Sequence, residues 1–160
     1  MNLRFLCAVA FAAMLAGCAT KSQPPLVPPP VAPSAAPPVS LAAQQRRLSE
    51  LFRGTPVVFE MLPNGLMRVE VPLKYSFDKG RTSVKPPLAA VLDRIAPSAQ
   101  SPGMKARVAP PADAGGAGTI AQERAASTRD YLVAKGVPVS HFASPASPRA
   151  DSIEIVIGRL

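Results

Sequence analysis

The side chains that most often carry catalysis or bind metals are scarce in this chain. Of its 160 residues, one is histidine and two are cysteine, and tryptophan is absent. His141 has no second histidine or mature cysteine with which to form a metal site. The glycine-rich stretch 115–118 is not followed by the Gly-Lys-Ser/Thr of a phosphate-binding loop. The sequence therefore predicts neither an enzyme nor a bound metal or cofactor.

One of the two cysteines, Cys18, follows an apolar segment near the N-terminus. Residues 1–4 form a short basic start, and residues 5–15 are an uninterrupted apolar run. A bilayer-spanning helix needs about 20 apolar residues, so this run is too short to span and is typical of a signal peptide. The residues before the cysteine, Leu15-Ala16-Gly17, resemble the lipobox of bacterial lipoproteins.

That resemblance implies a permanent membrane anchor. Residues 1–17 would be removed as a lipoprotein signal peptide, and the thiol and amine of Cys18 would carry acyl chains such as palmitate. Ala19 is not the aspartate that retains lipoproteins in the inner membrane in the enteric pattern, so the resemblance favours the outer membrane. An ordinary secretory signal followed by a chance cysteine remains the alternative. Cys7 would be lost with the signal, which leaves no disulfide.

The chain is strongly basic. Its formal net charge is +8, and it stays positive after removal of Arg4. A positive balance favours contact with anionic surfaces such as lipid head groups or cell-wall carboxylates, although an arginine-rich composition without a partner is equally open. Nucleic-acid binding is not expected, because the export signal gives the wrong compartment and no stripe of aromatic and basic residues is present.

Proline divides the chain into a linker and a domain. Eight of the 20 prolines lie between Pro24 and Pro38, where they favour an extended polyproline II conformation. Residues 18–46 are therefore predicted to be the lipidated cysteine and a Pro-rich linker, which could reach on the order of 85 Å at about 3.1 Å per residue. Residues 47–160 are predicted to form one domain.

The beginning of the folded part has helix and hairpin signals. Residues 41–52 could form a short helix with Leu48, Leu51 and Phe52 on one side. Two β-rich runs, 55–61 and 66–73, flank Asn64-Gly65, which is the strongest short hairpin signal. In the second run one face is mostly apolar, and it is formed by Met67, Val69 and Val71.

The rest of the chain alternates between helical and strand patterns. A helix with apolar Leu88, Val91, Leu92 and Ile95 should end at Pro97. A short strand through Ala106 and Val108 is cut off by Pro110-Pro111. The longest helix should run from Thr119 to Lys135 and bury Ala121, Ala125, Thr128 and Leu132. Ile153, Ile155 and Ile157 alternate in a final strand. The order, β-hairpin, α, β, α, β, indicates an α+β fold with a mixed sheet and helices on one face.

The ordered set of these segments resembles the OmpA-like C-terminal domain of the peptidoglycan-associated lipoproteins. The resemblance covers about Gly54 to Leu160 and is carried by four segments, Val71–Asp78, Leu88–Ile95, Ala125–Pro138 and Ile153–Ile155. It implies a β-hairpin followed by a βαβαβ order. It also implies a domain that faces the periplasm and binds the diaminopimelate residue of peptidoglycan without breaking a bond.

The same resemblance implies two ligand-binding residues. Asp113 would face the ammonium of diaminopimelate, and Arg124 would grip its carboxylate through the planar guanidinium. Three polar residues of the family pattern are replaced here, by Ala112, Ala117 and Ala121. Loss of hydrogen bonds worth about 0.5–1.5 kcal/mol each would weaken binding by roughly one to three orders of magnitude.

Two functions therefore remain in competition. The first is a lipid-anchored outer-membrane protein that tethers the envelope to peptidoglycan. The second is a divergent OmpA-like domain that acts as a protein-protein module in an envelope or secretion-system assembly. In the second case Asp113 would be a turn residue, and Arg124 would be a solvated helix residue paired with Glu123 or Asp130.

Overall fold

The computed structural model describes residues 40–113 and 118–160. The predicted signal peptide, Cys18 and the Pro-rich segment lie outside the described residues. No helix in the described part of the chain is long and apolar enough to cross a membrane.

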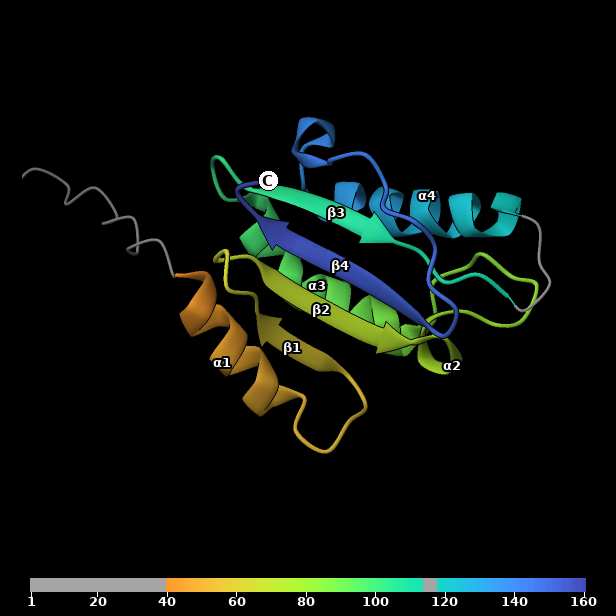
Figure 1. Cartoon of the computed structure of the whole chain (residues 1–160), viewed down its shortest axis with the longest axis horizontal. Coiled ribbons are helices and arrows are strands. Elements are labelled where there is room, and N and C mark those ends of the chain that lie inside the picture. The colour runs from red at the N-terminus through yellow and green to blue at the C-terminus, as the bar shows by residue number, and fades with distance from the viewer. Residues whose placement is uncertain (1–39, 114–117) are drawn as a thin grey trace, which may run out of the picture. The chain divides into compact units, whose positions relative to one another are not determined.

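Four strands form one sheet in the order β1-β2-β4-β3 (Figure 1). They are β1 (Val58–Met61), β2 (Met67–Pro72), β3 (Lys105–Ala109) and β4 (Ser152–Gly158). The predicted hairpin is confirmed, since β1 and β2 pair with Met61 opposite Met67. The expected mixed sheet is instead antiparallel at every neighbouring pair. The reason is that β4 inserts between β2 and β3, which run in the same direction but do not touch as neighbours.

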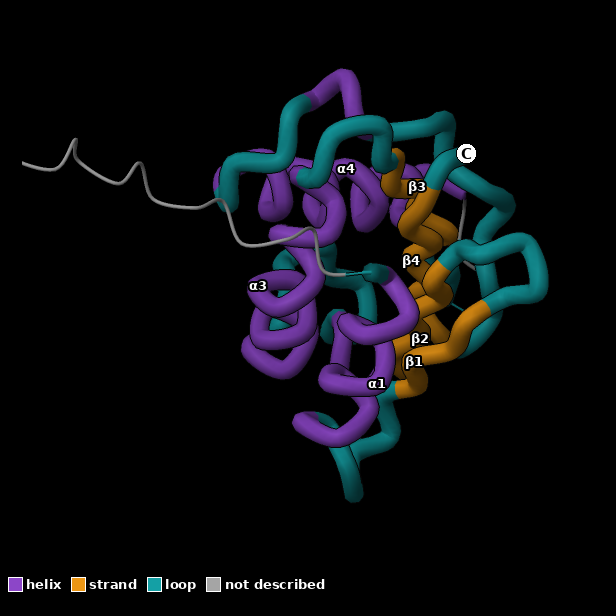
Figure 2. The backbone as a smooth tube through the Cα atoms, turned by 90° about the vertical axis from the view of Figure 1, so that its left-hand side faces the viewer, coloured by secondary structure: helices purple, strands orange, loops and turns teal. Residues whose placement is uncertain are grey.

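The helices cover one face of this sheet, as predicted. Helices α1 (Leu41–Leu51), α3 (Pro86–Gln100) and α4 (Gly118–Ala134) lie on the same side of the strands (Figure 2). A short helix α2 (Leu73–Ser76) follows β2, and a single turn of 3-10 helix η1 (Val139–His141) follows α4. The fold is therefore the predicted α+β arrangement of two layers.

The core lies between the sheet and the helices. The alternating residues predicted for β2 and β4 are all fully buried, as are the four apolar positions of α3. The stripe predicted for α4 is buried too, and it consists of Ala121, Ala125, Thr128 and Leu132. Hydrophobic periodicity thus identified the buried face of each of these elements correctly.

Helix α3 does not end at Pro97, contrary to the prediction. It continues to Gln100 with Pro97 inside it. Proline cannot donate to the carbonyl of the residue four positions earlier, and this normally breaks a helix. Here Ala96 and Ala99 are buried against the core on either side of the proline, so packing stabilises the last turn. Nearby, the Gln44 side chain of α1 donates to the Arg94 carbonyl at 3.2 Å.

Helix α1 begins at Leu41, within the range 18–46 that was assigned to the linker. The Ser40 hydroxyl caps its first turn by accepting from the Ala43 amide. Leu48 is 2% exposed and belongs to the core. The side-chain amide of Gln45 donates to the Phe59 carbonyl at 2.7 Å, so the helix also covers the outer edge of β1. The folded domain therefore includes α1.

Leu51, which the pattern placed on the same side of α1 as Leu48, has a side chain that is 54% exposed. The helix ends at this residue, and the next residue, Phe52, packs on Phe59 with ring centroids 5.4 Å apart.

The opposite edge of the sheet, at β3, is covered by the segment 142–149. The amides of Ala143, Ala146 and Arg149 donate to carbonyls of Ala106, Val108 and Pro110 at 2.9, 3.0 and 2.9 Å. In this segment only every third residue donates a hydrogen bond through its backbone amide. The two prolines, which have no N–H, lie between these donors and therefore interrupt no bond. An extended edge strand would otherwise offer unpaired backbone groups to other chains.

Candidate ligand-binding site

The structure places Asp113 and Arg124, which the resemblance implied would each face a ligand, in direct contact with one another. Asp113 lies in the segment after β3, and Arg124 lies in the first half of α4. Arg124 Nη1 lies 3.0 Å from Asp113 Oδ1, and Nη2 donates to Oδ2 at 3.2 Å. The two side chains form a parallel, bidentate ion pair, the geometry in which arginine holds a carboxylate most strongly.

The Arg124 side chain is completely buried, which the sequence did not predict. Its exposed fraction is 0%. Besides Asp113, it donates to three backbone carbonyls: Nε to Arg81 at 2.9 Å, Nη1 to Pro111 at 3.1 Å and Nη2 to Asp78 at 3.1 Å. Together with the bond to Asp113 Oδ2, these bonds give each of the three guanidinium nitrogens at least one acceptor. Such pairing is what makes a buried guanidinium tolerable.

An aromatic ring supports the same guanidinium. The Arg124 Cζ atom lies 5.2 Å from the centre of the Phe77 ring, and Phe77 is itself 2% exposed in the core. The ring gives the cation a favourable cation–π contact and prevents it from moving inward. The alternative in which Arg124 is a solvated helix residue paired with Glu123 or Asp130 is therefore wrong. Asp130 instead pairs with its neighbour Arg129.

Asp113 is the part of the pair that reaches the surface, because its side chain is 16% exposed. Its Oδ2 also accepts the Gly80 amide at 2.9 Å. The Gly80 amide, and next the Arg124 guanidinium, hold the pKa of the Asp113 carboxyl below its usual value of 3.8. The Asp113 carboxyl is therefore held in its ionised form, and a cationic ligand would find the charge already present.

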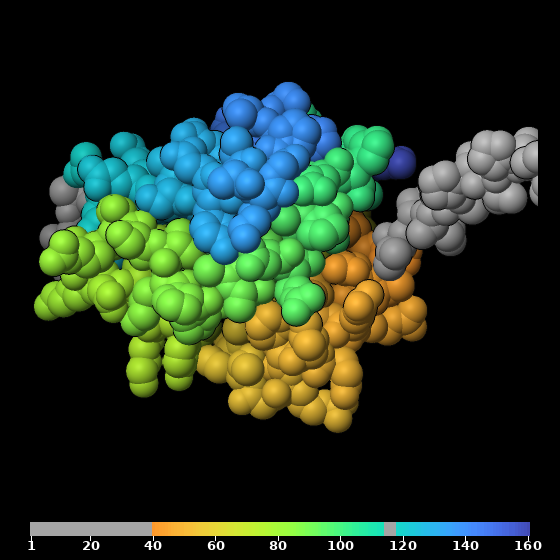
Figure 3. All heavy atoms as spheres, turned by 180° about the vertical axis from the view of Figure 1, so that it is seen from behind, coloured from red at the N-terminus to blue at the C-terminus, as the bar shows by residue number. Residues whose placement is uncertain are grey.

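The loop 78–81 forms the other wall of the site. The Arg81 amide donates to the Asp78 carbonyl at 3.0 Å, and Gly80 adopts φ +66°, which L residues rarely adopt. In Figure 3 the yellow-green atoms that follow α2 meet the teal atoms at the start of α4. The loop gives two carbonyls to Arg124 and one amide to Asp113, so it holds both members of the pair.

The two prolines after β3 are part of the site and not a break in it. The Pro111 carbonyl accepts from Arg124, and the Pro110 carbonyl accepts the Arg149 amide. The next amide, that of Ala112, donates to the Arg149 carbonyl at 2.8 Å. Proline lacks only the N–H, so its carbonyl remains available. The segment is thereby pinned on both sides and presents Asp113 in one position.

Sequence reasoning missed the groups of the loop 78–81 because they are backbone atoms. A carbonyl or amide leaves no residue-type signature, and only the glycine at position 80 indicated a turn. Two of the substituted positions can be placed: Ala121 is fully buried, and Ala112 is half-buried. The third, Ala117, lies outside the described residues. No group of three or more metal-ligating side chains occurs within residues 40–113 and 118–160.

Comparison with known proteins gives structural relatives only. No family model matches the chain, and no curated protein matches it in sequence. Among solved structures, a putative MotB-like protein from Desulfovibrio vulgaris matches with a TM-score of 0.58 at 14% identity, over 76% of this chain and 97% of that one. The cell wall anchor of the type VI secretion system (T6SS) from Pseudomonas aeruginosa matches with a TM-score of 0.57 at 18% identity, over 74% and 96%.

A third match is the periplasmic domain of Helicobacter pylori MotB. It has a TM-score of 0.52 at 17% identity, over 66% of this chain and 83% of that one. All three identities are too low to show more than the fold. That fold is the one predicted from the sequence, and the α+β architecture of OmpA-like domains is confirmed.

Proposed function

We propose that the chain is a lipid-anchored outer-membrane protein whose periplasmic domain tethers the envelope by binding peptidoglycan non-covalently. The observation that carries the proposal is the bidentate pair of Asp113 and Arg124, which the fold assembles from two separate segments beside an exposed loop. Support also comes from the shared fold, because one of the proteins that has it is a cell wall anchor. Binding of this kind needs no catalytic group.

The proposed ligand is a diaminopimelate residue, whose free end carries an ammonium and a carboxylate. Each of the three guanidinium nitrogens of Arg124 already has an acceptor within the protein, so we expect the ligand carboxylate to replace one of these acceptors. The net charge around the guanidinium is conserved when the ligand carboxylate replaces the Asp113 carboxylate. Asp113 turns to the ligand ammonium, and the ligand carboxylate takes its place on the guanidinium. The three backbone carbonyls keep Arg124 in position throughout.

Peptidoglycan sedimentation tests this proposal. Asp113→Asn keeps the shape of the side chain and removes the charge that would face the ammonium, so we expect affinity to fall by about tenfold or more. Asp130→Asn is the matched control, because it removes an exposed carboxylate from α4 away from the pair. Circular dichroism establishes that both variants are folded. If Asp113→Asn pellets with isolated peptidoglycan as well as the unmodified chain does, the proposed site is wrong.

The lipid anchor is a separate part of the proposal and rests on the sequence before Cys18. Labelling of cells with a radioactive fatty acid should mark the unmodified chain and not the Cys18→Ser variant. The labelled protein should fractionate with the outer membrane. An unmodified chain that takes up no label would contradict anchoring without affecting the test of peptidoglycan binding.

A second function, that of a protein-protein module in an envelope assembly, has one specific observation in its favour. Arg124 is wholly buried, and each nitrogen of its guanidinium has an acceptor within the protein, as expected of a residue that has become purely structural. A stable stoichiometric protein partner in detergent extracts, together with no retention by the cell wall, would favour this function over tethering.

A further inference from the structure

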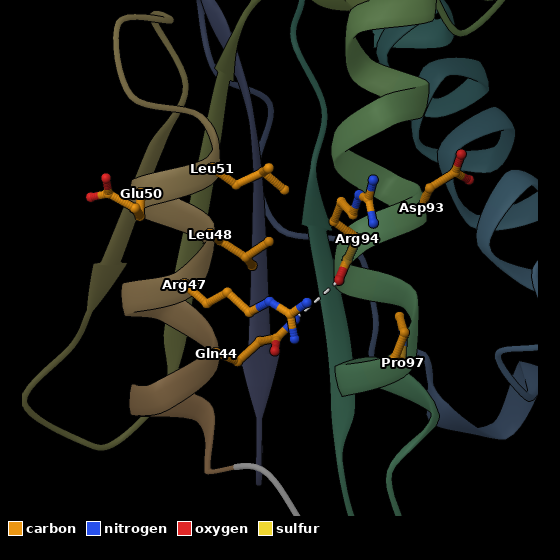
Figure 4. Close-up of a pocket in the computed structure, with 8 residues that line it drawn as sticks. All are labelled: Gln44, Arg47, Leu48, Glu50, Leu51, Asp93, Arg94 and Pro97. Carbon is orange, nitrogen blue, oxygen red and sulfur yellow. Dashed lines mark hydrogen bonds between the residues drawn. The ribbon is translucent and has the colours of Figure 1, made fainter.

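A cleft lined by two arginines lies between α1 and α3, at the other side of the domain from the Asp113 site. It encloses about 520 Å³ and is lined by Gln44, Arg47, Leu48, Glu50, Leu51, Asp93, Arg94 and Pro97 (Figure 4). Gln44 closes one end of the cleft, because its side chain donates to the Arg94 carbonyl. This bond joins α1 to α3, and the buried Leu48 packs α1 against the core. The cleft is therefore a fixed feature of the domain.

The charges around the cleft leave a net positive site. Its two acidic residues are neutralised elsewhere: Glu50 pairs with Arg53, and Asp93 accepts from Lys135 Nζ at 2.8 Å. Both carboxylates point away from the space between the helices in Figure 4. Asp93 also accepts the Tyr131 hydroxyl at 3.0 Å, which holds it toward α4.

The two arginines, in contrast, line the cleft from its two sides. In Figure 4 the Arg47 guanidinium extends from α1 into the space between the helices, and the Arg94 guanidinium lies against α3 at the edge of this space. Within the described part of the chain neither makes a side-chain hydrogen bond or ion pair. Two planar forks that lack acceptors match an anion with three or more oxygens, since a carboxylate with two oxygens is satisfied by a single fork.

The floor of the cleft is apolar. Leu48 and Pro97 line it, and Leu51 stands at its rim with 54% of its side chain exposed. A purely inorganic anion would leave these carbon atoms in contact with water. A phosphate attached to an apolar group would satisfy the arginines and cover the leucine at the same time.

We propose that this cleft is an anion-binding site in which Arg47 and Arg94 together hold a phosphate group. The site is independent of peptidoglycan binding, because it shares no residue with the Asp113–Arg124 pair. The phosphate comes either from a small soluble molecule or from the head group of an anionic phospholipid. The chemistry of recognition is the same in both cases, and the experiment distinguishes the two sources.

The experiment has two arms and uses proteins that start at residue 18 and carry Cys18→Ser, so that neither the apolar segment nor an acyl chain holds them on a membrane. In the first arm, inorganic phosphate is titrated while backbone amide shifts are followed by nuclear magnetic resonance. In the second arm, the protein is co-sedimented with vesicles of phosphatidylglycerol and phosphatidylcholine, and with vesicles of phosphatidylcholine alone.

We expect Arg47→Ala and Arg94→Ala each to weaken binding by about tenfold or more. Arg47→Lys, which keeps the charge and loses the fork, should be intermediate. Arg46→Ala is the matched control, since it removes the same charge from an exposed neighbouring position that does not line the cleft. Shifts caused by inorganic phosphate and confined to residues 44–51 and 91–97 indicate a soluble ligand, and arginine-dependent binding to the anionic vesicles alone indicates a lipid.

Two outcomes overturn the proposal. If Arg46→Ala weakens binding as much as Arg47→Ala does, the interaction is a diffuse effect of net charge and not a site. If neither inorganic phosphate nor anionic vesicles bind to the unmodified protein, the cleft does not recognise phosphate.

Discussion

At the scale of single residues, Arg124 is the most constrained side chain of the domain. It joins α4 to the loop 78–81 and to the segment after β3 through backbone carbonyls, and to Asp113 through charge. A guanidinium fits this role because its five donors point outward in one plane. The same residue is therefore needed for the fold whether or not a ligand binds.

Replacement of Arg124 should destabilise the domain strongly. Arg124→Ala removes the donor from three backbone carbonyls and from the Asp113 carboxylate, which keeps only the Gly80 amide; breaking a buried pair costs about 3–5 kcal/mol. Arg124→Lys should recover only part of the loss, because an ammonium cannot reach all the acceptors. Urea denaturation measures the change in the free energy of unfolding.

The control for this prediction is Arg129→Ala, an exposed arginine on the same helix that pairs only with its neighbour Asp130. Surface changes of this kind stay within about 0.5 kcal/mol. Equal effects of the two substitutions would contradict the structural role of Arg124.

The Asp113 carboxyl should make stability depend on pH in the acid range. Its pKa is lower in the folded domain than the usual 3.8, chiefly through the Gly80 amide and then Arg124. The folded state therefore binds this proton less readily than the unfolded chain does, and the contribution is fully present above the unfolded pKa. It is lost as the pH falls through the lower, folded pKa.

Comparison of the unmodified protein with Asp113→Asn measures this effect. The difference in unfolding free energy should be constant between about pH 5 and 7 and should shrink steadily below pH 4. Chemical denaturation at intervals from pH 2 to 7 gives both curves. A difference that grows on acidification would have the wrong sign for a carboxylate stabilised by its charge.

At the scale of elements, the loop 78–81 depends on the backbone freedom of glycine. Gly80 has φ +66°, and an added Cβ would meet no atom within 4 Å. The strain of Gly80→Ala is thus conformational only, about 1–2 kcal/mol. Gly80→Asn should cost less, because asparagine tolerates the left-handed conformation. Thermal unfolding of the two variants should rank them in this order, and equal stability would mean that the loop can adopt another conformation.

Helix α1 should behave as part of the core although it follows the linker. Leu48→Ala removes a side chain that is 2% exposed and should lower the free energy of unfolding by about 2–5 kcal/mol. Leu51→Ala, three positions later and 54% exposed, should change it by less than about 0.5 kcal/mol. Urea denaturation again gives the comparison, and a small effect at Leu48 would place α1 outside the cooperative unit.

Most elements could be predicted from the sequence, and the failures have local causes. Periodicity found β2, β4 and α4 because burial selects the residue type at each buried position. It failed at Pro97, where buried alanines on both sides of the proline outweigh its local effect. The antiparallel sheet was missed because strand order depends on contacts between distant segments, which no local pattern contains.

At the scale of the whole molecule, most of the buried apolar residues of the described part of the chain form one core between the sheet and the helices. Segments of residues 40–160 also cover both edges of the sheet. The candidate site, too, depends on contacts between distant segments and was predictable only in part. The resemblance pointed to Asp113 and Arg124 as residues of one site, whereas the burial of Arg124 and its backbone contacts could not be predicted, because they depend on carbonyls contributed by two separate parts of the chain.

A protein of residues 40–160 should therefore be as stable as the chain from residue 18. We expect the two free energies of unfolding to agree within about 0.5 kcal/mol, with a single cooperative transition in each case. Differential scanning calorimetry and urea denaturation provide the check. A clear loss of stability in the shorter protein would mean that residues 18–39 contribute to the fold.

The way α1 is attached has a mechanical consequence for a tether. A pulling force that enters the domain at Ser40 acts first on α1, which is joined to the remainder by two glutamine side chains and by Leu48. The strands are joined by continuous ladders of backbone hydrogen bonds, which must break together when loaded along their length. Under rising tension α1 should yield before the sheet does. In the proposed tether, the unfolded helix would add its length to the predicted Pro-rich linker and relieve the tension, and the Asp113 site would keep its shape.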